Sequence, residues 1–232
     1  MTPMLNQTSD HFDGTHFFNP EPTTRRSSGR RKGFLSMLRM RWSKDSDWAQ
    51  WPRHVPNKHY PAPDGTAPSA TFIGHSSFLL RLPGLNVLTD PVFSARCSPS
   101  QLVGPKRVRA PGIAISDLPE IGLILLSHNH YDHCDLISLR RIRRRFPAAA
   151  IVTLRGNAAW LRKQRLEGAV ELDWWQSSAV AGMTITATPA RHFAARTLWD
   201  RNLTLWGGFF LETPAGEKIY FAGDSGYTRF FS

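Results

Sequence analysis

Three histidines and one aspartate fall within six residues of this chain: His128, His130, Asp132 and His133. They follow the apolar run 121–126, which is typical of a buried strand. Asp135 comes two residues later and is a good N-cap for a helix. A strand that ends in a turn can direct several side chains at one centre, and imidazole and carboxylate groups bind zinc, iron and manganese. The spacing therefore predicts a metal site; the alternative is a histidine-rich surface turn without a metal.

Hydrophobic patterning predicts alternating strands and helices along the rest of the chain. Strands are expected at 70–82 with a break at Gly74-His75, and at 85–89, 121–126, 150–154, 171–175, 183–188, 206–212 and 218–221. Helices are expected at 136–145 and 157–166. This order predicts a layered α/β domain, and 232 residues suffice to bury its core.

The first 68 residues are predicted to form a region of their own. Residues 1–33 are polar and carry two arginine doublets, so they are interpreted as a basic peripheral arm. Residues 34–42 mix apolar and basic positions and are typical of a short surface helix, which could lie on a membrane or dock on its own domain. Residues 51–68 contain five prolines and form an extended linker. The globular domain is expected at 69–232.

The net charge of +11 favours anionic partners: nucleic acid, anionic lipid surfaces or phosphorylated substrates. The plain alternative is that the basic residues only form solvated faces. The arginines of 140–145 would be the surface of a non-catalytic nucleic-acid-binding protein. No helix-turn-helix, zinc-finger or base-stacking pattern accompanies them, so nucleic acid is not the expected partner.

Several absences in the sequence predict a cytoplasmic protein. The longest apolar run is too short to cross a bilayer. No secretory leader is expected at the N-terminus. The two cysteines, Cys97 and Cys134, do not make a disulfide framework.

The stretch Ser127-His128-Asn129-His130-Tyr131-Asp132-His133 resembles the metal motif of the metallo-β-lactamase superfamily. That family has an αββα sandwich fold with a metal site, usually dinuclear, at the edge of its two sheets. The resemblance points to His192 at the end of 186–192 and to Asp224 within 219–226 as further ligands. It implies two divalent ions, with zinc expected and iron or manganese as alternatives. One ion would be held by His128, His130 and His192 and the other by Asp132 and His133, with Asp224 bridging them. Asp132 is also the candidate catalytic residue, which would orient a metal-bound hydroxide or accept its proton.

Residues 71–77 resemble the branch of that superfamily that includes ascorbate-6-phosphate lactonases and the phospholipases D acting on N-acyl-phosphatidylethanolamine. Further stretches resemble the N-acyl-phosphatidylethanolamine-hydrolysing phospholipase D-like group specifically: residues 11–14, 18–20, 88–94, 98–100, 104–107, 199–202 and 205–206. The resemblance implies a metal-dependent phosphodiesterase that acts on a phospholipid or a small phosphodiester, in peripheral contact with an anionic membrane at its inner face. The alternative on the same fold is a lactonase that acts on a phosphorylated sugar acid.

The roles of two residues and one aromatic segment in these stretches stay open. His75 and Asp90 lie at strand ends near the expected site, where each either orients a ligand or serves only in a turn or in packing. The aromatic residues of 199–206 either line a substrate groove or belong to the core.

The sequence departs from the family in one respect. The family completes its second metal with a histidine well beyond the bridging aspartate, whereas no histidine follows His192 here. We therefore expect a sandwich that is incomplete at the C-terminus and a truncated or split form of a longer enzyme. A degenerate relative that keeps the fold without the chemistry is the further alternative.

Overall fold

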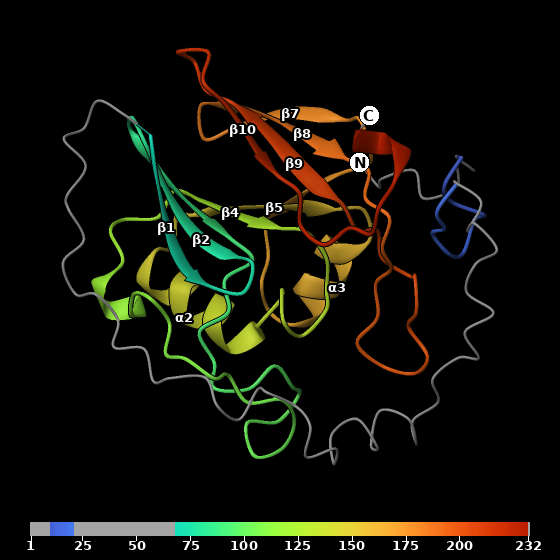
Figure 1. Ribbon diagram of the computed structural model, residues 1–232, viewed down its shortest axis with the longest axis horizontal. Coiled ribbons are helices and arrows are strands. Elements are labelled where there is room, and N and C mark those ends of the chain that lie inside the picture. The colour runs from blue at the N-terminus through green and yellow to red at the C-terminus, as the bar shows by residue number, and fades with distance from the viewer. Residues whose placement is uncertain (1–9, 21–67, 232) are drawn as a thin grey trace.

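The computed structural model describes residues 10–20 and 68–231 (Figure 1). The predicted helix at 34–42 and nearly all of the predicted linker at 51–68 lie outside the described residues. Two β-sheets face each other, and the two α-helices lie on the outer side of the first sheet. The mixed α/β sandwich predicted from the sequence is confirmed.

The first sheet has six strands in the order β1-β2-β3-β4-β5-β6. Their bounds are Ser69–Gly74, Ser77–Leu82, Leu85–Thr89, Leu123–Leu126, Ala150–Leu154 and Ala169–Leu172. Strands β1 to β3 pair antiparallel, and β3 to β6 pair parallel. All four residues of β4 are buried, because a central parallel strand is covered on both faces.

The second sheet has four antiparallel strands in the order β10-β9-β8-β7. Their bounds are Lys218–Phe221, Gly208–Glu212, Met183–Thr188 and Ser177–Val180. The core between the sheets contains Trp206 and Phe209, which are fully buried. Most of the predicted strands are confirmed, but β7 was not expected from the sequence. It is a short edge strand with alternating exposed residues, so it has no apolar run to mark it.

Several predicted strand boundaries were wrong, and tertiary contacts explain two of them. The strand expected at 171–175 ends at Leu172, since Trp175 has a φ of 66° and turns the chain toward Ala187. The strand expected to begin at residue 206 begins at Gly208, because the Gly207 amide donates to the carbonyl of Ser127 in the other sheet's loop.

The helices cover the first sheet. Helix α2 spans Leu136–Arg145 and α3 spans Asn157–Lys163, so the second ends three residues before the predicted limit. The Asp135 side chain accepts a hydrogen bond from the Ile137 amide, which confirms the predicted N-cap. One-turn 3-10 helices lie at Ile115–Asp117 and Arg229–Phe231. None of the helices within residues 10–20 and 68–231 has the length and apolar character that crossing a bilayer requires.

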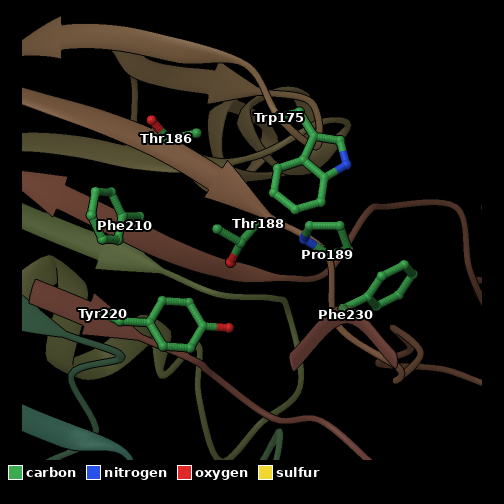
Figure 2. A pocket seen from close by; sticks show the side chains of 7 residues that line it. All are labelled: Trp175, Thr186, Thr188, Pro189, Phe210, Tyr220 and Phe230. Atoms are coloured by element: carbon green, nitrogen blue, oxygen red, sulfur yellow. The ribbon is translucent and has the colours of Figure 1, made fainter. Parts of the chain in front are cut away.

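The outer face of the second sheet carries an apolar hollow of about 320 Å³ (Figure 2). Trp175, Phe210 and Tyr220 line it from β8–β10 and the turn before β7. Within the part of the chain that the structure describes, no α-helix covers this face. The described part of the chain therefore has three layers: the helices, the first sheet and the second sheet. That the sandwich is incomplete at the C-terminus stays a prediction.

Residues 10–20 pack into the domain although they belong to the predicted arm. Phe12 and Phe17 are buried in the core between the sheets. The Phe17 amide donates to the carbonyl of Asn202, and the Asn19 side chain donates to the carbonyl of His192 at 2.9 Å. The domain boundary at residue 69 stays a prediction, but this segment joins the core because its two phenylalanines need burial.

His11 anchors the same segment through two carboxylates and a tryptophan ring. Its ring nitrogens lie 2.6 Å from carboxylate oxygens of Asp10 and Asp173, and its ring stacks on Trp174. Arg155 also pairs with Asp173, at 3.0 Å. Burial by itself lowers the pKa of His11, but the two carboxylates outweigh it and raise that pKa above 6.5. The protonated form of His11 is therefore favoured in the folded state.

We expect His11→Gln to cost more stability near pH 6 than near pH 9. A group whose pKa is raised on folding contributes stability that is complete below its unfolded pKa and is lost as pH rises through its folded pKa. Urea unfolding of the protein and the variant at both pH values measures the difference. His16→Gln, at an exposed neighbour in the same segment, is the control. An equal or larger loss at the higher pH would contradict the prediction.

Candidate metal centre

The predicted metal motif forms the loop between β4 and α2. His128 and His133 are buried, at 1% and 0% exposure, while His130 and Asp132 are partly exposed. The parallel strands β3 and β4 end at the same edge of the sheet, so the turn after β3 lies beside this loop. The Ser127 amide donates to the carboxylate of Asp90 in that turn at 2.8 Å.

Three histidines converge on one point of this edge. His130 Nδ1 lies 2.7 Å from His128 Nε2 and 3.2 Å from His192 Nε2. The ligand atoms of the three side chains all lie within 4.8 Å of one another. His192 comes from the segment after β8, so the second sheet supplies it. The distances of 2.7 and 3.2 Å from His130 Nδ1 to the other two histidines are compatible with ligands that share a cation with bonds of about 2.0–2.1 Å.

The protonation states of these histidines suit metal binding. Burial holds the pKa of His128 well below 6.5 and lowers the pKa of His130 to about 4. Burial also lowers the pKa of His192. All three imidazoles are therefore neutral at pH 7 and have a lone pair to donate.

A second group of ligand types adjoins the first. His133 Nε2 lies 3.2 Å from Asp224 Oδ2 and 4.0 Å from Asp132 Oδ2. Asp224 Oδ2 also lies 3.8 Å from His192 Nε2, so this carboxylate faces both groups. Asp224 follows β10 in a turn where Gly223 has a φ of 61° and no room for a β-carbon against Ser127 and Gly207. All six residues predicted as ligands are thus close together, although their roles as ligands stay a prediction.

The buried carboxylate of Asp90 orients His133, a role that the sequence left open. It is fully buried and lies 2.7 Å from His133 Nδ1. The hydroxyl of Ser127 donates to the same carboxylate at 2.6 Å. Burial would lower the pKa of His133, but the carboxylates of Asp224 and Asp90 raise it to about 10. With Nδ1 held by Asp90, Nε2 faces Asp132 and Asp224.

His133 Nε2 supplies the test of whether this site fits a metal ion. The atom is buried and makes no hydrogen bond of good geometry within the described part of the chain, although Asp224 Oδ2 lies 3.2 Å away. Asp132 Oδ2 lies 4.0 Å away, so two carboxylates, which are oxygen donors for a cation, lie beside this nitrogen. The donor set of imidazoles and carboxylates therefore fits divalent metal ions.

The sequence analysis missed Arg196, whose side chain hydrogen-bonds the backbone of the metal-motif loop, residues 127–135. Its guanidinium donates to the carbonyls of Asn129 at 2.6 Å and Cys134 at 2.8 Å. The same group lies over the ring of Tyr131, 3.9 Å from its centroid. No pattern marks Arg196, because its partners are backbone carbonyls more than sixty positions away. Cys134 itself is buried in the core between the first sheet and its helices.

Comparison with known proteins decides the family. The family described as the β-lactamase superfamily domain matches residues 85–229, which include all six predicted ligands. This chain belongs to the metallo-β-lactamase superfamily. The resemblance seen in the sequence is thereby confirmed, and so is the fold class that it implied.

Two relatives show where the chain stands within the superfamily. An uncharacterized protein of Mycobacterium tuberculosis is 41% identical over 171 residues, which are 73% of this chain and 45% of that protein. An N-acyl-phosphatidylethanolamine-hydrolyzing phospholipase D of Caenorhabditis elegans is 36% identical over 68% of this chain and 47% of its own length. The chain therefore spans about half the length of the curated relatives it matches.

A solved structure shows the same fold. The metallo hydrolase from the archaeon Ignicoccus hospitalis superposes with a TM-score of 0.51 over 69% of this chain and 62% of that chain. The two sequences are 22% identical, so this likeness supports the fold alone.

Proposed function

We propose that the protein is a metal-dependent hydrolase that cleaves a phosphodiester, in the manner of a phospholipase D. The observation that carries the proposal is the convergence of three neutral histidines, one oriented histidine and two carboxylates at one sheet edge. The Caenorhabditis elegans relative is named as a phospholipase D, and this supports a phosphodiester as the substrate. Two divalent ions bound there would supply a water of lowered pKa and stabilise the charge that develops on the phosphoryl oxygens.

The residues of the chain have distinct roles in this proposal. His128, His130 and His192 would hold one ion, Asp132 and His133 the other, and Asp224 would face both. Burial would raise the pKa of Asp132, but a hydrogen bond from His75 and the charge of His133 lower it. Asp132 is therefore a carboxylate at neutral pH, which can orient an attacking water or accept its proton.

The loop after His192 supports an amphiphilic substrate. Leu198 and Trp199 are 89% and 87% exposed near its tip. The loop is tied to the metal motif through Arg196 and is closed by Asp200, whose carboxylate accepts from the amides of Arg196 and Thr197. Trp206 of the stretch 199–206 is in the core, whereas Trp199 is exposed to solvent. Exposed leucine and tryptophan side chains suit a lipid surface better than a sugar acid, and peripheral contact with an anionic membrane is part of the proposal.

We expect the double variant Leu198→Ser, Trp199→Ser to lose turnover on a lipid substrate in vesicles by about tenfold, because two apolar side chains leave the interface. Turnover on a short-chain, soluble phosphodiester should stay within about twofold. Ile137→Ser, on the exposed face of α2, is the control and should change neither rate. An equal fall on both substrates would contradict a role at the lipid surface.

The function itself is tested by turnover with the purified 232-residue protein. An N-acyl-phosphatidylethanolamine, a soluble phosphodiester and a phosphorylated sugar-acid lactone are compared with and without a chelator, alongside His128→Ala. Chelator-sensitive cleavage of the phosphodiesters, lost in the variant, is the expected result. Cleavage of the lactone alone would establish the lactonase alternative, and no turnover with bound metal would indicate a degenerate relative.

A further inference from the structure

We propose that His75, in the turn between β1 and β2, is a ligand of the second cation together with Asp132 and His133. The inference rests on the divalent-metal site of the proposed function and adds to it a ligand from a separate part of the chain. Its basis is the juxtaposition of two imidazoles and a carboxylate whose ligand atoms lie within 4.8 Å of one another.

The distances fit ligands that share one ion. His75 Nε2 lies 3.2 Å from Asp132 Oδ2, and His133 Nε2 lies 4.0 Å from the same oxygen. Two ligands with bonds of about 2.0–2.1 Å to a common ion can be separated by up to about 4.2 Å. The rings of His75 and His133 meet edge to face, with centroids 5.0 Å apart. The three side chains thus surround a common point.

The second observation is His133 itself. Its side chain is fully buried, its Nδ1 is held by Asp90, and its Nε2 makes no hydrogen bond within the described residues. The nitrogen is turned toward the carboxylates of Asp132 and Asp224 rather than into an apolar core. A cation bound among His133, Asp132 and His75 would accept the lone pair of this nitrogen and would lie beside both carboxylates.

Hydrogen bonds hold the turn that carries His75 against the turn after β3. The Ser77 hydroxyl donates to the carbonyl of Asp90 at 2.5 Å, and the Thr89 hydroxyl donates to the carbonyl of Ser76 at 2.8 Å. These two hydrogen bonds join the turn between β1 and β2 to the end of β3 at the same sheet edge. His75 has a φ of 54°, which is uncommon for a residue with a β-carbon. Such backbone conformations persist where the surroundings impose them and are concentrated at functional sites.

An ion pair between His75 and Asp132 is the simpler explanation of their contact. It accounts for the 3.2 Å distance but does not explain why the imidazole of His133 also lies against His75 and Asp132. The two explanations differ in what they predict for cation binding, because an ion pair would compete with the cation and a ligand would assist it.

The experiment is a titration of the full chain with Zn²⁺ by calorimetry and with Co²⁺ by visible absorption. His75→Asn and His75→Gly are the variants, because both residues tolerate a positive φ and keep the turn. His16→Asn, at an exposed histidine that is not among the candidate ligands, is the matched control. We expect two cations in the protein and the control, with the weaker site loosened at least about tenfold in both variants and its Co²⁺ bands altered.

Two unchanged affinities in the variants would overturn the inference, as would tighter binding of the second cation, which identifies the ion pair. A single cation in the protein and variants alike would overturn it too. These readouts are independent of turnover. If the second cation is lost in the variants while no phosphodiester is cleaved by any form, the proposed function fails and the ligand stands. If turnover and binding are both unchanged, the ligand fails and the function stands.

Discussion

Replacing Asp90 by alanine is expected to lower the free energy of unfolding by about 3–5 kcal/mol, the cost of removing one partner from a buried charged network. The carboxylate is fully buried, accepts from the amide and hydroxyl of Ser127 and lies 2.7 Å from His133 Nδ1. Its loss leaves the Ser127 amide and the imidazole without their acceptor. Urea unfolding measures the effect.

The same variant should weaken binding of the second cation, because His133 loses the contact that fixes its orientation. Asp90→Asn should have a smaller effect, because asparagine keeps the shape of the side chain but has only one oxygen to accept from Ser127 and His133. Asp117→Ala, at an exposed position in the 3-10 helix Ile115–Asp117, is the control and should cost less than about 0.5 kcal/mol. If Asp90→Ala is as stable as that control, the carboxylate does not support the site.

Replacing Arg196 by methionine is expected to loosen the motif loop and to reduce affinity for the cation at His128, His130 and His192 by about 10- to 100-fold. The guanidinium holds two loop carbonyls, at Asn129 and Cys134, and stacks over Tyr131. Charged hydrogen bonds of this kind contribute about 1.5–3 kcal/mol each before screening, so a stability loss of about 2 kcal/mol should accompany the effect at this partly exposed residue.

Methionine keeps much of the volume of arginine and its apolar stem, so the change isolates the hydrogen bonds and the charge. Zn²⁺ titration and urea unfolding are measured on the same preparation. Arg141→Met, on the exposed face of α2, is the matched control. A loss of stability with unchanged cation affinity would show that Arg196 supports the fold but not the metal centre.

The sequence predicted best those elements whose apolar residues follow directly from how each strand or helix is buried. Strand β4 is an apolar run because both its faces are covered, and α2 begins at Asp135 because that side chain caps it. Leu139 and Ile142 are three positions apart and share the buried face of α2. The short edge strand β7 carries no such signal, since an exposed edge imposes no apolar alternation.

The candidate ligands were predicted at two different levels. The spacing of His128, His130, Asp132 and His133 pointed to a metal site directly, because one strand end positions all four. His192 and Asp224 were assigned only through the family resemblance, because each is an ordinary residue after a strand until the second sheet closes on the first. Their distances to His130 and His133 come from that packing.

The sequence by itself determined the fold class, most of the strands and the motif that supplies four candidate ligands, because these depend on short-range spacing and burial. Only the tertiary structure decided that Asp90 orients His133, that Arg196 holds the motif loop, that residues 10–20 join the core, and that His75 faces Asp132. Each of these contacts joins segments far apart in the chain. Their geometry depends on how the two sheets pack, which no local pattern records.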